Sequence, residues 1–145
     1  MQTFLPFPNL RATAMCLDYK RLGKQRVEAK QIHDIVSGSR TTGGWVNHPA
    51  VTMWRGYPDA LALYHNVIID EWVARGYVNN MPHLPIPDGE ILMPLWFGDE
   101  AFHSSHRRKL LSKDYEFYGE FGWREDDGSA QCEYVWPTGE SEGGD

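Results

Sequence analysis

Three features of the 145-residue sequence predict a mainly α-helical protein. Apolar residues recur at alternating spacings of three and four in several stretches, as they do on one face of an α-helix. Few stretches alternate apolar and polar residues, as half-buried strands would. The length fits one domain, and a 41% apolar content with six tryptophans can fill its core. We expect a compact single-domain bundle of about three helices, with long ordered loops and an acidic C-terminal tail.

The first long helix is predicted by an apolar stripe near the N-terminus. Residues 22, 29, 32 and 36 are apolar at helical spacing, and Gln25 interrupts the stripe once. We expect this helix to run over residues 16–36, because Ser37-Gly38-Ser39 is a strong stop signal. Residues 1–10 contain two prolines and should be extended.

Two further helices are predicted to begin at prolines. Pro49 suits the first turn of a helix, with Asn47 or His48 at its entry. A stronger helix should begin at Pro58, present one apolar face and end at Arg75-Gly76. Both predictions place a helix start where proline's missing N–H costs nothing.

The second half of the chain opens with a proline-rich segment. Four prolines between residues 78 and 95 exclude a helix and predict an ordered loop or a lid. A last helix is expected over residues 99–113, followed by an aromatic run that ends at Trp123. We therefore expect one more helix and no repeat in this half.

Charge is distributed unevenly along the chain. Residues 1–115 hold 13 Lys and Arg against 11 Asp and Glu, whereas residues 116–145 hold one Arg against nine acids. We expect a helical domain over residues 1–123 and an acidic tail over residues 124–145, with an apolar clip at residues 134–137. Such a tail could cover a basic surface as a mimic of DNA and restrain non-specific binding.

Other features bear on the cellular setting. No apolar run reaches the roughly 18 residues of a membrane span, and the N-terminus lacks the charged start and apolar core of a signal peptide. We expect a cytoplasmic protein with no membrane partner. Cys16 and Cys132 are too few for a disulfide framework or a zinc site, so both should be reduced and structural.

Glu28 is the leading candidate for chemistry, because it stands as a single carboxylate among five cations on the first predicted helix. The cations are Lys20, Arg21, Lys24, Arg26 and Lys30. The cations would attract an anionic partner such as a phosphate backbone. A carboxylate in the same place repels phosphate, so its presence suggests a chemical role. The alternative is a solvated Lys24–Glu28 pair, since this i,i+4 spacing is common on helices.

The last predicted helix carries a second candidate group. Asp99, His103 and His106 are spaced to lie on one face, which resembles a set of metal ligands. With Arg107, the two histidines could instead donate to phosphate oxygens, and we favour this interpretation. Nothing elsewhere in the sequence completes a metal site, so we expect neither a metal nor another cofactor.

Three residues near loops are further candidates. Trp45 and Trp96 stand in stretches rich in Gly or Pro, where an aromatic ring can stack on an extruded base or simply fill the core. His48 is either a helix cap or a DNA contact. The sequence has no Gly-rich phosphate loop, no Gly-x-Ser-x-Gly motif and no Cys/His nucleophile pair.

A set of short motifs in a fixed order suggests a family. They are the Met-Gln-Thr-Phe-Leu-Pro start, Leu17-Asp18, Arg26-Val27-Glu28, His48 to Trp54, Leu61 to Tyr77, and Tyr115 to Gly119. They occur in the family's order and together span residues 1–119, which is most of the chain. The sequence resembles the pyrimidine-dimer DNA glycosylases related to the T-even phage repair enzyme, in particular a bacterial and phage branch.

This resemblance implies a small all-α enzyme that kinks duplex DNA, extrudes a nucleotide, cleaves its glycosidic bond and then nicks the abasic strand. In this family the nucleophile is the α-amine of the N-terminal residue, and the essential carboxylate is a glutamate on an early helix. The match implies Glu28 as that carboxylate, with Arg26 nearby. It also implies His103 and Arg107 as phosphate contacts.

The reacting amine is expected to belong to Met1, because the large side chain of Gln2 should leave the initiator methionine in place. The residues expected to contact DNA are Lys20, Arg21, Lys24, Arg26, His48, His103, His106 and Arg107. We expect a monomer that binds double-stranded DNA with a damaged or modified base. Imine formation by an amine needs no metal or cofactor.

Two other functions stay open on the sequence alone. A non-catalytic DNA-binding module could use the same scaffold, and a metal-dependent hydrolase could use Asp99, His103 and His106. One residue separates Arg26 from Glu28, where the family has an adjacent pair, so the target base is also open.

Overall fold

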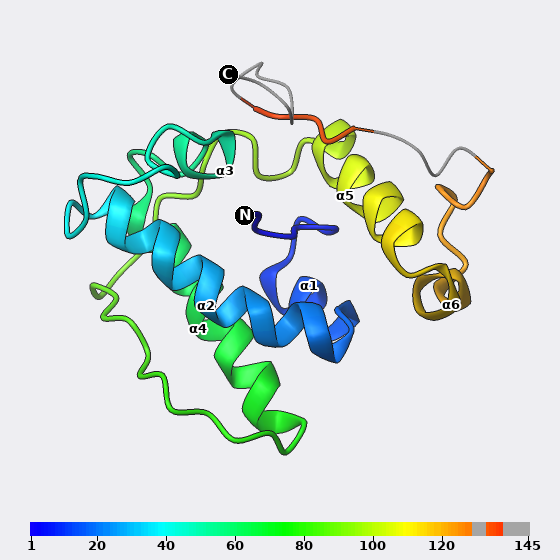
Figure 1. Cartoon of the computed structure of the whole chain (residues 1–145), viewed down its shortest axis with the longest axis horizontal. Coiled ribbons are helices and arrows are strands. Elements are labelled where there is room, and N and C mark those ends of the chain that lie inside the picture. The colour runs from blue at the N-terminus through cyan, green and yellow to red at the C-terminus, as the bar shows by residue number, and fades with distance from the viewer. Residues whose placement is uncertain (129–132, 138–145) are drawn as a thin grey trace.

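The computed structural model describes residues 1–128 and 133–137, and its regular elements are all helices (Figure 1). Three long helices dominate: α2 (Tyr19–Val36), α4 (Pro58–Ala74) and α5 (Glu100–Lys113). The shorter elements are α1 (Leu10–Cys16), α3 (Pro49–Thr52), α6 (Tyr115–Tyr118) and the 3₁₀ helix η1 (Gly119–Phe121). The mainly α fold class predicted from the sequence is confirmed.

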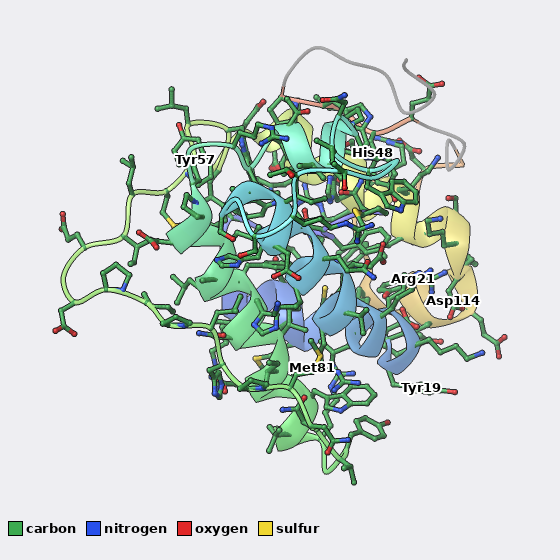
Figure 2. The ribbon with its side chains drawn as sticks, turned by 60° about the vertical axis from the view of Figure 1, so that its left-hand side comes forward. Tyr19, Arg21, His48, Tyr57, Met81 and Asp114 are labelled. Atoms are coloured by element: carbon green, nitrogen blue, oxygen red, sulfur yellow. The ribbon has the colours of Figure 1, made fainter. Side chains whose placement is uncertain are left out.

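The first residues of the chain lie at the centre of this arrangement. Helices α2 and α4 pack side by side and α1 packs against α4, while α5 lies on the other side of the N-terminus (Figure 1). Arg21 of α2 and Asp114, which follows α5, lie on the same side of the molecule (Figure 2). The N-terminal segment, residues 1–7, is therefore flanked by α2 and α5.

The start of the first long helix was predicted wrongly. Helix α2 begins at Tyr19, because Leu17 is extended and the Asp18 carboxylate caps the helix by accepting from the Arg21 amide at 3.3 Å. Tyr118 holds this cap: its hydroxyl donates to the Asp18 carboxylate and accepts from the Asp18 amide. The residues before the break form the separate helix α1, which is capped by Asn9.

The other helix limits agree with the sequence signals. His48 caps α3 through Nδ1, which accepts from the Ala50 amide at 3.0 Å. Helix α4 begins at Pro58 and is followed by Gly76, whose φ of 90° is favourable only for glycine. Asp99 caps α5.

The contact between α2 and α4 depends on a glycine. The Trp72 ring of α4 lies over Gly23 of α2, where an added Cβ would come within 2.8 Å of it. The Arg26 guanidinium lies 4.3 Å from the centre of the same ring, and Tyr77 stacks on it at 4.3 Å. Trp72 therefore fills the space that the missing side chain leaves.

The proline-rich segment is an ordered loop, one of the two predicted forms. The side chain of Asn66 bonds both main-chain groups of Leu84, donating to its carbonyl at 2.9 Å and accepting from its amide at 2.8 Å. The Trp96 indole donates to the Met53 carbonyl at 2.9 Å, so this tryptophan packs into the domain. The loop is therefore anchored to α4 through Asn66, and the residue that follows it is anchored beside α3 through Met53.

The described part of the tail packs on α5. Tyr134 and Trp136 of the expected apolar clip are buried in the core cluster. The Val135 amide donates to the Ser105 hydroxyl at 3.0 Å. Residues 129–132 and 138–145 lie outside the described residues, so the predicted DNA mimicry by the tail stays a prediction.

The expectations for Cys16 and for the membrane can be compared with the structure. Cys16 is buried and free, and burial raises the pKa of its thiol to about 12. Cys132 lies outside the described residues. Within residues 1–128 and 133–137, no helix has both the length and the apolar character needed to cross a bilayer.

Substitution of Gly23 by Ala should destabilise the fold. The added methyl group would clash with Trp72, and such overpacking costs about 1–3 kcal/mol, more than the roughly 1 kcal/mol that Ala gains in a helix. Urea denaturation should show a lower free energy of unfolding. Gly44→Ala is the control, because a Cβ there meets nothing within 4 Å. Equal stability of the two variants would contradict this role of Gly23.

Candidate active site

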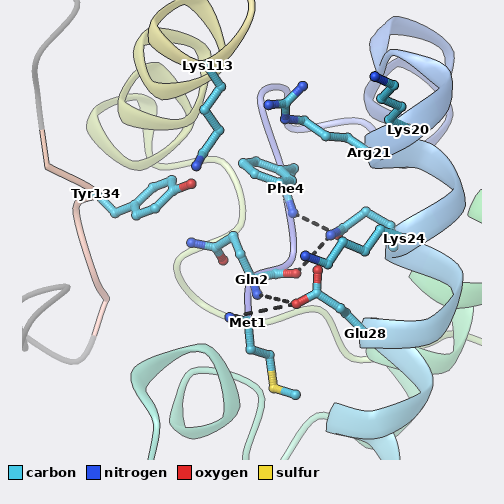
Figure 3. Close-up of a pocket in the computed structure, with 10 residues that line it drawn as sticks. Met1, Gln2, Phe4, Lys20, Arg21, Lys24, Glu28, Lys113 and Tyr134 are labelled. Carbon is cyan, nitrogen blue, oxygen red and sulfur yellow. Dashed lines mark hydrogen bonds and ion pairs between the residues drawn. The ribbon is translucent and has the colours of Figure 1, made fainter.

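A pocket of about 360 Å³ opens between α2, α5 and the N-terminal segment. Its lining residues are Met1, Gln2, Phe4, Lys20, Arg21, Lys24, Gln25, Glu28, Lys113 and Tyr134. Glu28 and Lys24 lie on one side, and Lys113 and Tyr134 lie on the other (Figure 3). Ligand pockets in proteins generally measure roughly 300–1,000 Å³, so this one can hold a small group such as a nucleoside.

Helical spacing explains the α2 wall. Lys20, Lys24 and Glu28 are four residues apart, which brings them onto one face, with Arg21 and Gln25 beside them. Glu28 therefore lies in a pocket that three of the five neighbouring cations of α2 line. Its side chain is only 13% exposed.

The carboxylate of Glu28 faces the N-terminal amine. Oε2 lies 3.7 Å from the Met1 amine and accepts a hydrogen bond from the Gln2 amide at 3.2 Å (Figure 3). A carboxylate and an amine thus share one pocket, and groups of these two kinds can act as a base and as a nucleophile. Met1 and Glu28 are distant in sequence, but α2 brings Glu28 back beside the N-terminus.

Gln25 holds the N-terminal segment on the α2 side. Its Oε1 accepts from the Phe4 amide at 3.0 Å, and its Nε2 donates to the Gln2 carbonyl at 2.9 Å. The Tyr64 hydroxyl lies 2.6 Å from Gln25 Oε1 and 2.8 Å from the Phe4 carbonyl. Burial, followed by the charge of Glu28, raises the pKa of Tyr64, which keeps the hydroxyl protonated as a donor.

Helix α5 holds the next residues of the segment. His106 Nδ1 accepts from the Leu5 amide at 2.9 Å. His103 Nε2 accepts from the Gly98 amide, so its Nδ1 carries the proton and donates to the Leu5 carbonyl at 2.7 Å. Arg107 donates to the Pro6 carbonyl at 2.6 Å. Burial lowers the pKa of His103 and lowers that of His106 to about 3, so both rings are neutral.

These contacts correct the prediction that His103, His106 and Arg107 bind phosphate. Both histidines are fully buried and Arg107 is 7% exposed, so none of the three presents a surface to DNA. Arg107 also forms a buried ion pair with Glu125 at 2.9 Å. Burial opposes the charge on Glu125, but hydrogen bonds from Arg107 and Ser104 lower its pKa to about 2.

The metal alternative is not supported either. Asp99 uses its carboxylate to cap α5, whereas His103 and His106 turn toward Leu5. Within the described residues, no group of three or more potential ligands could hold a metal ion. The three residues therefore have two separate structural roles: Asp99 caps the helix, and the two histidines hold Leu5.

Two other predicted DNA contacts lie away from the pocket. Arg26 donates to Asn79 Oδ1 at 2.8 Å and covers Trp72, on the side of α2 opposite Glu28. Burial lowers the pKa of Arg26. His48 caps α3, and its ring contacts Trp45 at 5.2 Å between centroids. Lys20, Arg21 and Lys24 are the predicted cations that line the pocket.

Sequence reasoning missed the far wall. Lys113 lies at the end of α5, and Tyr134 lies in the predicted apolar clip. Neither residue belongs to a sequence motif that would indicate a pocket. The polar interruption at Gln25 was a usable signal, because a polar residue in an apolar stripe has to find buried partners. Those partners proved to be main-chain groups of the N-terminal segment.

A cationic rim around a pocket is the kind of surface that nucleic-acid-binding proteins present to phosphates. Residues 1–85 match the family model described as pyrimidine dimer DNA glycosylase. This match covers more than half of the chain, which therefore belongs to the pyrimidine dimer DNA glycosylase family. The membership supports a DNA glycosylase function with DNA as substrate. No curated protein and no solved structure gives a significant match.

The neutral His106 should make the fold sensitive to acid. Its folded-state pKa lies below the value of 6.5 expected in the unfolded chain, so its stabilising contribution is complete above pH 6.5 and is lost as the pH falls toward 3. One such proton is worth about 1.4 kcal/mol per pH unit. Denaturant titrations between pH 7 and 4 should show a shallower loss of stability for His106→Gln than for the wild type. Identical slopes would mean that His106 is not protonated on unfolding.

Proposed function

We propose that the protein is a DNA glycosylase with associated abasic-site lyase activity, in which the Met1 amine is the nucleophile and Glu28 the assisting carboxylate. The observation that carries the proposal is the 3.7 Å separation of these two groups inside a pocket with a cationic lining. Family membership supports the glycosylase step. The lyase step is proposed from the position of the amine.

The chemistry balances without a cofactor. The neutral amine attacks C1′ of the extruded nucleotide, the bond from C1′ to the base breaks, and the base leaves with the bonding electrons and takes up a proton. Glu28 stabilises the positive charge that develops on the sugar. The bond from C1′ to the ring oxygen then breaks, the ring oxygen takes up a proton, and a protonated imine forms between the amine and C1′. Glu28 takes a proton from C2′, and the C3′–O bond breaks with its electrons leaving on the phosphate, which nicks the strand. Water hydrolyses the imine and returns the free amine.

The cations around the mouth support binding of the DNA backbone. Lys20 and Lys24 on α2 and Lys113 on α5 form no ion pair within the part of the chain that the structure describes, whereas Arg21 pairs with Asp18 at 3.1 Å. Lysines without ion pairs can neutralise phosphates and release counterions. A duplex is too wide for a 360 Å³ pocket, so the target nucleotide has to leave the base stack.

Borohydride trapping on an abasic-site duplex tests the proposed mechanism. The wild type should give a covalent protein–DNA adduct, because borohydride reduces the imine to a stable amine. A form with residues added before Met1 should give none, since its α-amine is displaced from the pocket. Glu28→Gln should bind the duplex but nick it at least about a hundredfold more slowly, within the usual contribution of a general base.

The trapping result separates the two main functions. Loss of the adduct only when the terminus is extended supports the Met1 amine. No adduct in any form, with duplex binding retained and unaffected by Glu28→Gln, would favour a non-catalytic DNA-binding module.

Lys24 should contribute one phosphate contact. Lys24→Gln should weaken duplex binding and reduce the slope of log affinity against log salt by about one. The matched control is Lys30→Gln, which removes the same charge from the same helix where Lys30 pairs with Asp34 at 2.5 Å. Fluorescence anisotropy over a salt series measures both slopes. Equal slopes for the two variants would mean that Lys24 does not contact a DNA phosphate.

A further inference from the structure

Met1 is held differently from the residues that follow it. Gln25 bonds main-chain groups of both Gln2 and Phe4, and the Gln2 amide also donates to a carboxylate oxygen at 3.2 Å. Met1 lies before all of these contacts. Within the described residues, its main chain is held only by the 3.7 Å ion pair between the amine and Glu28. The clamps on the following residues therefore do not fix the direction of the amine.

The side chain of Met1 is buried although it lies at the N-terminus. It is 4% exposed and packs against the hydrophobic core cluster. The first residues of a domain are usually poorly ordered unless contacts tie them down. We propose that this side chain is a positioning group, which holds the reacting amine beside Glu28. The inference rests on the proposed function, because it takes the Met1 amine to be the nucleophile.

One torsion angle links the side chain of Met1 to its amine. The peptide bond between Met1 and Gln2 is planar and is held by the contacts of Gln2, so the remaining freedom is rotation about the Met1 Cα–C bond. This rotation moves the amine and the side chain together, because both are attached to Cα. A side chain fixed in the core therefore fixes the amine as well. A small side chain would leave the amine free to turn away from Glu28.

The two ends of Met1 face different surroundings. The residue as a whole is half-buried, so its exposed surface belongs to the main chain, which carries the amine. The amine points toward Glu28, whereas the side chain turns away from Lys113 and Tyr134 (Figure 3). Contact with a substrate in the pocket therefore falls to the main chain, and the side chain is left to hold it. Fixing a nucleophile in a productive orientation can raise a rate by orders of magnitude.

Variants of residue 1 that keep a free amine test this role. Each is made with an N-terminal fusion partner whose removal leaves the chosen residue first, and mass spectrometry checks the resulting terminus. Met1→Leu keeps an apolar side chain of similar volume, whereas Met1→Ala keeps the amine and removes the buried group. With protein in saturating excess over an abasic-site duplex, the rate of adduct formation under borohydride trapping is measured. Fluorescence anisotropy measures the affinity for the same duplex separately.

A positioning role predicts a loss of rate at saturation without a matching loss of affinity. Met1→Ala should form the adduct at least about tenfold more slowly, with a duplex affinity within about twofold of the wild type, because a small misplacement of a reacting group is costly. Met1→Leu should restore most of the rate. Circular dichroism checks that each protein is folded at the assay temperature. If Met1→Ala is unfolded there, Met1→Val removes less buried surface and should show a smaller loss of the same kind.

Three results would overturn the positioning role. They are equal saturating rates for the folded small-side-chain variant and the wild type, a loss accounted for by weaker duplex binding, and a Met1→Leu rate as low as that of Met1→Ala. The proposed function is overturned by a different result, the absence of an adduct with the wild type. Adduct formation at one rate by every form with a free amine, and by none with residues added before Met1, would defeat the role of the side chain and leave the proposed function intact.

Discussion

The placement of residues 1–7 between α2 and α5 is the constraint on which the rest of the structure depends. No strand partners this segment in the described structure; side chains supply its hydrogen bonds instead, from Gln25 on one side and His103, His106 and Arg107 on the other. Each of these side chains is buried. Unpaired polar groups are costly in a core. The buried side chains and the main chain of the extended segment therefore satisfy each other's hydrogen bonds. The amine reaches Glu28 as a result.

This constraint also accounts for the charges inside the domain. Both histidines of α5 have to be neutral rings, because His106 accepts from the Leu5 N–H and His103 accepts from the Gly98 N–H. The guanidinium of Arg107 reaches Pro6 while buried, and Glu125 balances its charge there. A buried pair of this kind is costly to break from either side. The start of the tail is thus part of the support of the active site.

The sequence predicted the fold class and the long helices, because these follow from periodicity and caps, whereas Met1 and Glu28 were named as site residues only because the family resemblance implies them. It failed where local pattern and tertiary structure disagree. The break at Asp18 was missed because its cap is held by Tyr118, a hundred residues away. His103 and Arg107 have the composition of a phosphate site, and only the fold shows that they face the N-terminal segment. The sequence pattern does not show whether a polar side chain such as Arg107 donates to a buried main-chain group or to a phosphate at the surface.

The pocket has two walls of different origin along the chain. Met1, Glu28 and the lysines of α2 lie within the matched residues 1–85, whereas Lys113 and Tyr134 lie beyond them. The residues of the proposed reaction and part of the proposed recognition surface are therefore encoded separately. Under that proposal, the second half of the chain could be exchanged to change what enters the pocket, provided that the replacement still holds Leu5 and Pro6.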